Sequence, residues 1–197
     1  MVILINFDTI IITILLISIL KNFFMENNKY GKIFWITGLS GSGKSTIGEH
    51  LKKMINRKYG KTIIIHGDNM RDIFQLKFYT MTKRLKLGKS YSDLCRLLAQ
   101  QNINVVFTTV GLFNELFLYN KKNLKKNYVE IYIKTDIEKL KKNKSKTFYK
   151  VRTHNVWGLD LKPQFPKKPD IMIENNFQVS PAILAKKIFE KINIIKS

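Results

Sequence analysis

The chain has 197 residues, of which 45% are hydrophobic and 25% are charged, as in an ordinary globular domain. Its single cysteine, Cys95, excludes a disulfide framework and a zinc site built from cysteine thiolates. The composition therefore excludes disulfide-rich secreted proteins and collagen-like chains, and it predicts a reducing, cytoplasmic setting.

The charge balance is strongly basic, with 35 lysine and arginine residues against 14 acidic residues and a formal net charge of +21. Only 5 of the 35 are arginine, the side chain that nucleic-acid sites use most for paired contacts with bases and phosphates. The lysines are spread along the chain, often in pairs, which favours a solvated surface over a nucleic-acid interface. We therefore expect no nucleic-acid partner, although a positive field of this kind attracts phosphorylated small molecules.

The first 24 residues form an almost uninterrupted apolar run with one charge of each sign, Asp8 and Lys21. An apolar helix of about 20 residues spans a bilayer, so one interpretation is a membrane anchor that leaves the basic body at the inner face of the membrane. The second is translated upstream sequence ahead of a start at Met25, and the third is an extra buried element. In each case we expect residues 25–197 to form the main domain and residues 1–24 to have no catalytic role.

From residue 30 onward, short apolar runs alternate with longer segments of helical periodicity. Continuous apolar runs are typical of strands covered on both faces, and their alternation with helices predicts right-handed βαβ units around a parallel sheet. The sequence therefore predicts an α/β fold of three layers, α/β/α, with a parallel sheet of about five strands. The expected strands are 33–37, 62–66, 104–109, 129–134 and 170–173, and the expected helices are 44–58, 90–102, 114–126, 136–142 and 180–194.

The segment 143–168 has no clear periodicity, is basic, and contains Pro163 and Pro166, two of the four prolines. A long segment without regular structure inside a compact domain is usually a functional loop. We therefore predict a mobile lid loop over this segment.

The strongest motif follows the first predicted strand. Residues 38–46, GLSGSGKST, match the phosphate-binding pattern G-x-x-x-x-G-K-[ST] of P-loop NTPases. Glycines let the backbone curl so that successive N–H groups point at phosphate oxygens, and the following helix adds its positive N-terminal end. We expect Lys44 to reach the β- and γ-phosphates of ATP and the Ser45 hydroxyl to bind Mg²⁺. The predicted ATP-binding residues are Gly38, Ser40, Gly41, Ser42, Gly43, Lys44, Ser45 and Thr46.

A second polar group, HGDNMR at 66–71, directly follows the second predicted strand. The carboxyl ends of parallel strands share one edge of the sheet, so these side chains are expected to face the same crevice as the phosphate loop. Asp68 is suited to accept a proton from an attacking hydroxyl or to hold Mg²⁺, and Arg71 to bind an anionic substrate beside Asn69. The alternative is structural: an Asp–Asn turn that caps a helix over 69–78.

Together, GLSGSGKST and the following GDNxR resemble the adenylylsulfate kinases, a family of small P-loop enzymes, and the similarity extends over residues 31–192. The resemblance implies transfer of the γ-phosphoryl group of ATP to a ribose 3′-hydroxyl, with Mg²⁺ required. It implies that Lys44 and Asp68 are catalytic, that Arg71 holds the substrate, and that the protein is a homodimer. The segments SKTFY at 145–149 and NVWGLD at 155–160 resemble family segments in the mobile region that covers the substrate.

Several positions depart from the family pattern. His66 stands where the family has the first Asp of D-G-D, LGKS at 87–90 replaces N-I-R-R, and VGLFNE at 110–115 replaces I-S-P-[FY]-R. The transfer machinery is kept while the acceptor-reading positions are changed, and an anion that loses its arginine partner is bound much less tightly. This pattern resembles the family members encoded with bacterial capsule genes, among them cytidine diphosphoramidate kinase. We therefore expect cytidine diphosphoramidate as the acceptor, in capsular phosphoramidate biosynthesis, with adenylyl sulfate as the alternative.

Three further side chains are candidates for substrate binding. We expect Phe74 to stack on the base, Lys146 to approach the anionic end and Trp157 to cover the nucleotide; packing roles are the alternatives for the two aromatic residues. A regulatory GTPase is disfavoured because NKSK at 143–146 lacks the Asp of the guanine-binding N-K-x-D pattern. A non-catalytic nucleotide-binding protein stays an alternative, since His66 and Leu87 alter the usual site.

Overall fold

The computed structural model describes residues 15–16, 30–76, 80–142, 157–158 and 161–195. The chain divides into two units, Met1–Tyr30 and Gly31–Ser197. In the first unit, Leu15 and Leu16 are helical and exposed, and the rest of the predicted apolar segment 1–24 lies outside the described residues. Within the described part of the chain, no helix combines the length and the apolar character needed to cross a membrane.

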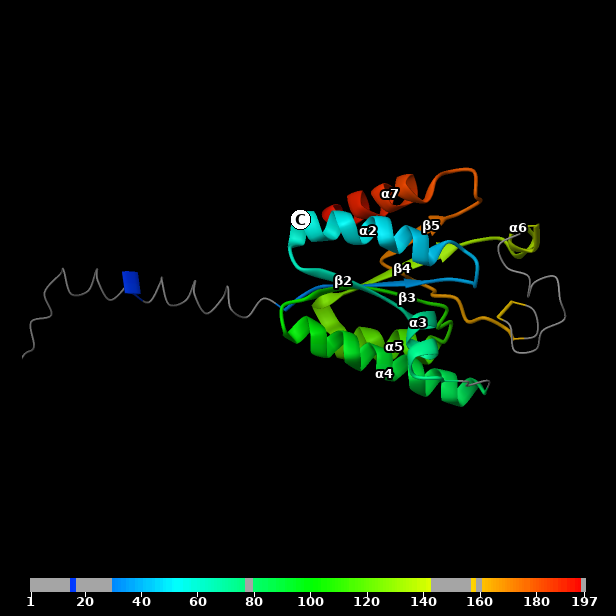
Figure 1. The fold of residues 1–197 in the computed structure, drawn as a ribbon, viewed down its shortest axis with the longest axis horizontal. Helices are drawn as coiled ribbons and strands as arrows, with labels where there is room; N and C mark the ends of the chain where they lie inside the picture. The colour runs from blue at the N-terminus through cyan, green and yellow to red at the C-terminus, as the bar shows by residue number, and fades with distance from the viewer. Residues whose placement is uncertain (1–14, 17–29, 77–79, 143–156, 159–160, 196–197) are drawn as a thin grey trace, which may run out of the picture. The chain divides into compact units, whose positions relative to one another are not determined.

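The second unit is built on a five-stranded sheet in which every strand pair is parallel (Figure 1). The strand order is β2-β3-β1-β4-β5, so the chain places later strands on both sides of β1. Each strand lies where the sequence predicts it, to within one residue at either end, and the parallel sheet is confirmed. The strands are β1 (Ile33–Thr37), β2 (Thr62–His66), β3 (Asn104–Thr109), β4 (Tyr128–Lys134) and β5 (Ile171–Glu174).

Helices cover both faces of this sheet, so the predicted three-layer architecture is confirmed. The helices are α2 (Lys44–Tyr59), α3 (Gly67–Ile73), α4 (Met81–Gln100), α5 (Asn114–Leu124), the 3₁₀ helix η1 (Lys125–Asn127), α6 (Ile137–Lys142) and α7 (Pro181–Ile195). One face carries α2 and α7, and the opposite face carries α4 and α5 (Figure 1). The short helices α3 and α6 follow the carboxyl ends of β2 and β4.

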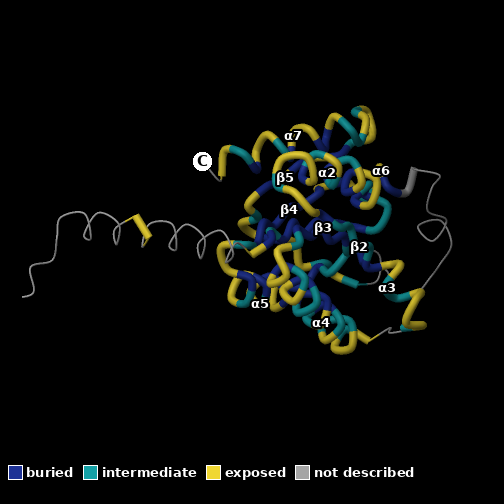
Figure 2. The backbone as a smooth tube through the Cα atoms, turned by 60° about the vertical axis from the view of Figure 1, so that its left-hand side comes forward, coloured by how far each residue is buried: buried dark blue, intermediate teal, exposed yellow. Residues whose placement is uncertain are grey.

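Two clusters of buried apolar side chains hold these layers together. Ile36, Ile47 and Ile188 belong to the cluster beneath α2 and α7. Phe107 and Leu116 belong to the cluster beneath α4 and α5. Along the backbone, the strands are the most buried segments, while the outer sides of the helices are exposed (Figure 2). Burial on both faces explains why the strands read as continuous apolar runs in the sequence.

Helix α4 is longer than predicted, since it begins at Met81 rather than near residue 90. Thr80 is its N-cap, and the Thr80 hydroxyl accepts a hydrogen bond at 3.4 Å from the backbone N–H three residues on. Lysines in the first turns interrupt the apolar periodicity, although Met81, Leu85 and Leu87 still pack against the core. The segment 87–90, which departs from the family pattern, therefore lies inside a helix rather than at its start.

Glu130 is an acid buried near the amino end of β4, with 1% of its side chain exposed. Its Oε2 lies 3.3 Å from Lys121 Nζ of α5, and its Oε1 accepts a hydrogen bond from the Tyr128 hydroxyl at 3.3 Å. Burial raises the pKa of Glu130, and the Lys121 ammonium opposes this rise. Lys121 is therefore the cation that stabilises the ionised form of a buried carboxylate.

We expect Lys121→Met to lower the free energy of unfolding by roughly 2–3 kcal/mol near neutral pH, because it leaves a buried carboxylate uncompensated. Without the cation, the folded-state pKa of Glu130 rises further above the ordinary 4.5. When a group has a higher pKa in the folded state than in the unfolded state, its contribution to stability is fully present at pH values below the unfolded-state pKa. That contribution is lost as the pH rises through the folded-state pKa. Urea unfolding should therefore show a larger loss near neutral pH than near pH 4.5. Equal losses at the two pH values would contradict this, and Lys122→Met, at an exposed neighbour, is the control.

Candidate active site

The phosphate loop connects β1 to α2 at the carboxyl edge of the sheet, as the motif predicts. Gly38, Gly41 and Gly43 have positive φ angles of 152°, 79° and 87°, a region that side chains other than glycine rarely adopt. A Cβ atom at Gly43 would also lie 2.8 Å from Asn175 Nδ2. Both backbone conformation and space therefore require glycine at this position, and they explain the third glycine of the motif.

Lys44 is buried in this loop although it carries a charge, with 8% of the residue exposed. Its Nζ donates a hydrogen bond to the Leu39 carbonyl at 2.6 Å, so the side chain folds back over the loop. The Ser42 hydroxyl is also buried and has no hydrogen-bond partner within the described part of the chain. A buried cation beside a buried polar atom without a partner fits a loop that holds the phosphates of a nucleotide. Ser45 and Thr46, in the first turn of α2, are exposed.

Asn175 is a component of the site that the motif does not contain. It follows β5 directly, is 4% exposed, and its Nδ2 donates a hydrogen bond to the Ser42 carbonyl at 3.0 Å. Its Oδ1 accepts from the Phe177 N–H at 3.0 Å, and its own N–H donates to the Lys134 carbonyl at 2.9 Å. Asn175 therefore ties the phosphate loop to the ends of β4 and β5. A polar residue immediately after an apolar strand is the sequence signal that indicates it.

We expect Asn175→Ala to lower the free energy of unfolding by about 1–3 kcal/mol, because the Ser42 carbonyl and the Phe177 N–H lose a buried partner. We also expect ATP affinity to fall by about fivefold or more as the loop loosens. Urea unfolding and calorimetric titration with a non-hydrolysable ATP analogue measure the two effects. Asn123→Ala is the control, because Asn123 lines the cavity between α4 and α5, which contains no residue of the phosphate loop. Unchanged nucleotide affinity in Asn175→Ala would remove Asn175 from the site.

Asp68 and Arg71 lie on α3, directly after β2, at the sheet edge that also carries the phosphate loop. Arg71 Nη2 and Asp68 Oδ1 form an ion pair, and the two side chains are 41% and 59% exposed. Tyr91 of α4 interacts electrostatically with this pair: burial raises the pKa of its hydroxyl, Arg71 lowers that pKa and Asp68 raises it. Tyr91 belongs to none of the sequence motifs, and its buried hydroxyl has no hydrogen-bond partner among the described residues.

The other predicted substrate-binding residues have different surroundings. Asn69 is exposed on α3, and Phe74, which is 59% exposed, follows that helix. Trp157 is 6% exposed, and its ring lies edge-on to Phe113, with centroids 5.0 Å apart and an interplanar angle of 88°. Trp157 therefore packs in the core beneath α4 and α5, and its contact with a nucleotide stays a prediction. Lys146 and most of the predicted lid loop lie outside the described residues.

Mg²⁺ is the metal that the predicted chemistry requires. Within the described residues, no three His, Cys, Asp or Glu side chains gather as a metal-binding cluster. Mg²⁺ does not need such a cluster, because it commonly keeps several waters and binds one or two protein oxygens together with substrate phosphates. The Ser45 hydroxyl and the Asp68 carboxylate are exposed oxygen atoms of the kind that binds Mg²⁺. The residues present therefore fit a magnesium ion that binds together with the nucleotide.

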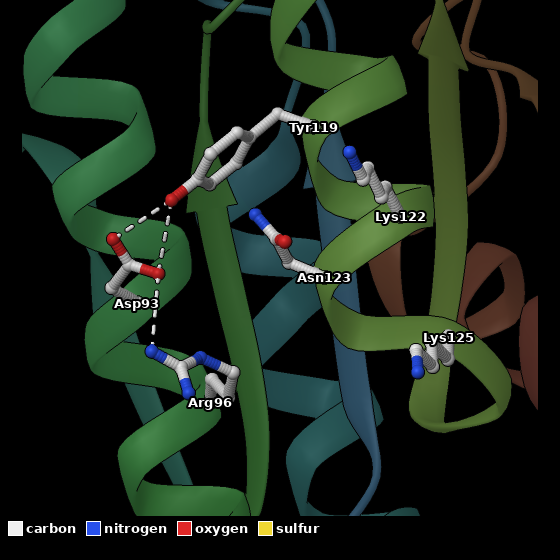
Figure 3. Close-up of a pocket in the computed structure, with 6 residues that line it drawn as sticks. All are labelled: Asp93, Arg96, Tyr119, Lys122, Asn123 and Lys125. Atoms are coloured by element: carbon white, nitrogen blue, oxygen red, sulfur yellow. Dashed lines mark hydrogen bonds and ion pairs between the residues drawn. The ribbon is translucent and has the colours of Figure 1, made fainter.

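A cavity of about 320 Å³ lies between α4 and α5 (Figure 3). The Tyr119 hydroxyl lies 3.1 Å and 3.0 Å from the two Asp93 carboxylate oxygens, and Arg96 Nη2 lies 3.5 Å from Asp93 Oδ1. The cavity contains none of the predicted site residues, so we do not assign nucleotide binding to it. Its lining residues are Asp93, Arg96, Tyr119, Lys122, Asn123 and Lys125.

Known proteins of similar sequence belong to the family that the phosphate loop and the GDNxR segment predict. The sequence profile of the adenylylsulphate kinase family matches residues 30–174. The chain is 35% identical over 172 residues to the cytidine diphosphoramidate kinase of Campylobacter jejuni, covering 83% of this chain and 99% of that protein. It is 32% identical over 149 residues to the adenylyl-sulfate kinase of Clostridium acetobutylicum, covering 73% of this chain and 74% of that protein.

Solved structures support the same fold. The structure of a Mycobacterium tuberculosis APS kinase in complex with AMPPNP and APS superposes with a TM-score of 0.75 at 24% identity, over 83% of this chain and 98% of that one. The family predicted from the phosphate loop and the GDNxR segment is therefore confirmed: the chain belongs to the adenylylsulphate kinase family.

Proposed function

We propose that this chain is an ATP-dependent kinase that transfers the γ-phosphoryl group to the ribose 3′-hydroxyl of a nucleotide, with cytidine diphosphoramidate as the acceptor. The observation that carries the proposal is the position of the Asp68–Arg71 pair at the sheet edge that holds the phosphate loop. A carboxylate beside a bound triphosphate is suited to activate a hydroxyl, and a neighbouring guanidinium is suited to bind an anionic group. The 35% identity to a cytidine diphosphoramidate kinase over nearly its full length supports the choice of acceptor.

The proposed reaction is a direct in-line transfer. The acceptor 3′-oxygen forms a bond to the γ-phosphorus while the bond to the β–γ bridging oxygen breaks, ADP leaves, and the hydroxyl proton passes to the Asp68 carboxylate. The phosphate-loop N–H groups and the Lys44 ammonium stabilise the charge that develops on the phosphoryl oxygens. Arg71 exchanges its contact with Asp68 for the anionic 5′ group of the acceptor, which leaves the Asp68 carboxylate available to the hydroxyl.

Ser45 and Asp68 are the residues that would hold Mg²⁺, which neutralises charge on the β- and γ-phosphates when it is bound. The Ser45 hydroxyl lies in the first turn of the helix that begins at Lys44, where the positive end of the helix also favours phosphate. The assignment of these two residues to the metal stays part of the proposal.

The altered segments support a changed acceptor pocket. Lys89, in the segment that replaces N-I-R-R, forms an ion pair with Glu115, in the segment that replaces I-S-P-[FY]-R. The pair connects α4 to α5, and the Lys89 ammonium also lies 5.4 Å from the Tyr119 ring centroid. Two segments that depart from the family pattern thus contact each other. This is expected if their substitutions together adapt one pocket to a different acceptor, rather than each removing a function independently.

Acceptor preference tests the proposal. The full chain is incubated with MgATP and either cytidine diphosphoramidate or adenylyl sulfate, and ADP release is measured by a coupled assay. We expect kcat/KM to be at least about tenfold higher for the cytidine compound, since one or two lost anion contacts account for such a ratio. A preference for adenylyl sulfate, the acceptor of the Clostridium relative, would overturn the acceptor assignment.

One other outcome is distinguishable in the same assay. ATP binding without acceptor-dependent ADP release would favour a non-catalytic nucleotide-binding protein. A homodimer, a cytoplasmic location and the organisation into an apolar segment 1–24 and a kinase domain 25–197 stay predictions; sedimentation and cell fractionation of the full chain test them.

A further inference from the structure

The His66 ring joins two elements that flank it at the carboxyl edge of the sheet. Its Nδ1 lies 2.8 Å from the Thr108 hydroxyl of β3, and its Nε2 lies 3.0 Å from Glu49 Oε1 of α2. The ring is mostly buried, with 17% of the side chain exposed, whereas 52% of the Glu49 side chain is exposed. The chain of contacts Glu49–His66–Thr108 therefore extends from α2 across the end of β2 to β3.

The two partners fix the orientation of this ring. An ionised carboxylate only accepts hydrogen bonds, so the His66 Nε2–H donates to Glu49. In the neutral imidazole, Nδ1 then accepts a hydrogen bond from the Thr108 hydroxyl. Because both ring nitrogens are engaged, the side chain has one preferred position, and the backbone of His66 is held with it.

Helix α3 has few other attachments, among them Met70, which is partly buried and packs against the core beneath α4 and α5. The helix has seven residues, and among them only Gly67 is buried. An isolated helix of this length is not stable, and His66, its N-cap, makes no side-chain hydrogen bond to the helix backbone. The position of Asp68 and Arg71 therefore depends on how the end of β2 is held.

At its other end the chain of contacts reaches the helix that begins with the phosphate-loop lysine. Lys44 is the first residue of α2, and Glu49 lies one turn beyond Ser45 on the same side of the helix, since residues four apart are neighbours. The His66 ring therefore connects the helix that starts the ATP site with the helix that carries Asp68.

We propose that Glu49, His66 and Thr108 are positioning residues that set the distance between Asp68 and the phosphate loop. The expected effect on turnover rests on the proposed kinase function, whereas the expected effect on α3 does not. A displacement of reacting groups by about 1 Å costs about 100-fold in rate, so a loosened α3 lowers kcat. The phosphate loop binds ATP, and removing the Glu49–His66 contact leaves the loop's own contacts in place. We therefore expect the affinity for ATP to change little.

A competing role for Glu49 is to supply negative charge to the site. Glu49→Gln separates the two roles, because the glutamine oxygen still accepts the His66 hydrogen bond while the charge is gone. Positioning predicts that Glu49→Gln behaves like the unchanged protein. A charge role predicts that it behaves like Glu49→Ala.

The test uses the full chain with His66→Ala, Glu49→Ala and Glu49→Gln. Glu190→Ala is the matched control, because Glu190 is an exposed glutamate of another helix, α7. Hydrogen exchange over residues 67–73, affinity for AMPPNP and steady-state kinetics are measured for each variant. In the two partner-removing variants, His66→Ala and Glu49→Ala, we expect exchange to rise about tenfold and kcat to fall about tenfold, with AMPPNP affinity within about twofold. Glu49→Gln and Glu190→Ala should match the unchanged protein in all three readouts.

Unchanged exchange over residues 67–73 in both partner-removing variants overturns the proposal, and so does a Glu49→Gln variant as impaired as Glu49→Ala. If His66→Ala fails to fold, Glu49→Ala decides, because the half-exposed Glu49 side chain fills no core space. If the unchanged protein phosphorylates no nucleotide acceptor, the proposed function fails while hydrogen exchange still tests the positioning of α3.

Discussion

Replacing Lys44 with alanine is expected to lower kcat/KM for phosphoryl transfer by at least about 100-fold, the effect of removing one preorganised charged donor from a transition state. The Lys44 ammonium is buried in the loop and already donates a hydrogen bond to the Leu39 carbonyl, so it sits among polar groups that face inward. No other lysine of the phosphate loop is available to replace it. Initial rates of ADP release, measured at several ATP concentrations with saturating acceptor, give kcat/KM for ATP and so measure the loss.

The matched control is Lys53→Ala, which removes an exposed lysine from the same helix. It should retain full turnover and the urea midpoint of the unchanged protein, as expected of a surface substitution, and Lys44→Ala should still unfold in one cooperative urea transition. Turnover of Lys44→Ala within about tenfold of the unchanged protein would contradict the assignment of the phosphate loop as the donor site.

Asp68→Asn is expected to lower kcat by about 100-fold or more, because an amide does not accept the proton of the attacking hydroxyl. Asparagine keeps the size of the side chain, so the effect reports chemistry rather than packing. Affinity for AMPPNP in the absence of metal should change by less than about threefold, since the phosphate loop supplies the donor contacts. Single-turnover kinetics separate the chemical step from product release.

Asp72→Asn is the control for this substitution, because Asp72 is an exposed aspartate in the same short helix. It should leave kcat unchanged. Full turnover in Asp68→Asn would remove Asp68 from its proposed role and direct attention to Tyr91, whose hydroxyl interacts electrostatically with Asp68 and Arg71.

The sheet and the phosphate loop could be predicted because both are encoded locally. Strands buried on both faces leave continuous apolar runs, so the ends of β1, β2 and β3 were predicted to the residue. The phosphate loop has a fixed spacing, and its glycines are required by the positive φ angles of Gly41 and Gly43. In this chain, local sequence patterns predict the structure wherever backbone conformation or burial restricts the residue type.

The parts that could not be predicted depend on contacts between distant segments. The first turns of α4 are rich in lysine, and only packing of Met81 and Leu85 against the core reveals their helical face. A polar residue directly after an apolar strand marks Asn175 as a candidate, but that local signal does not identify its partner, the phosphate loop, which lies 133 positions away in the sequence. His66 departs from the family pattern in the sequence itself, but its contact with Glu49 follows only from the folded chain. Trp157 was predicted at the nucleotide, and its burial against Phe113 likewise depends on the tertiary fold.

The measurement that tests the central claim most directly is the position of the transferred phosphate. The full chain is incubated with MgATP and cytidine diphosphoramidate, and the product is examined by phosphorus–proton correlation NMR. The account predicts one new phosphomonoester coupled to the ribose H3′, formed in equal amount to ADP. ADP formed without a new ester, or an ester at any other carbon, would contradict the assignment of this chain as a nucleotide 3′-hydroxyl kinase.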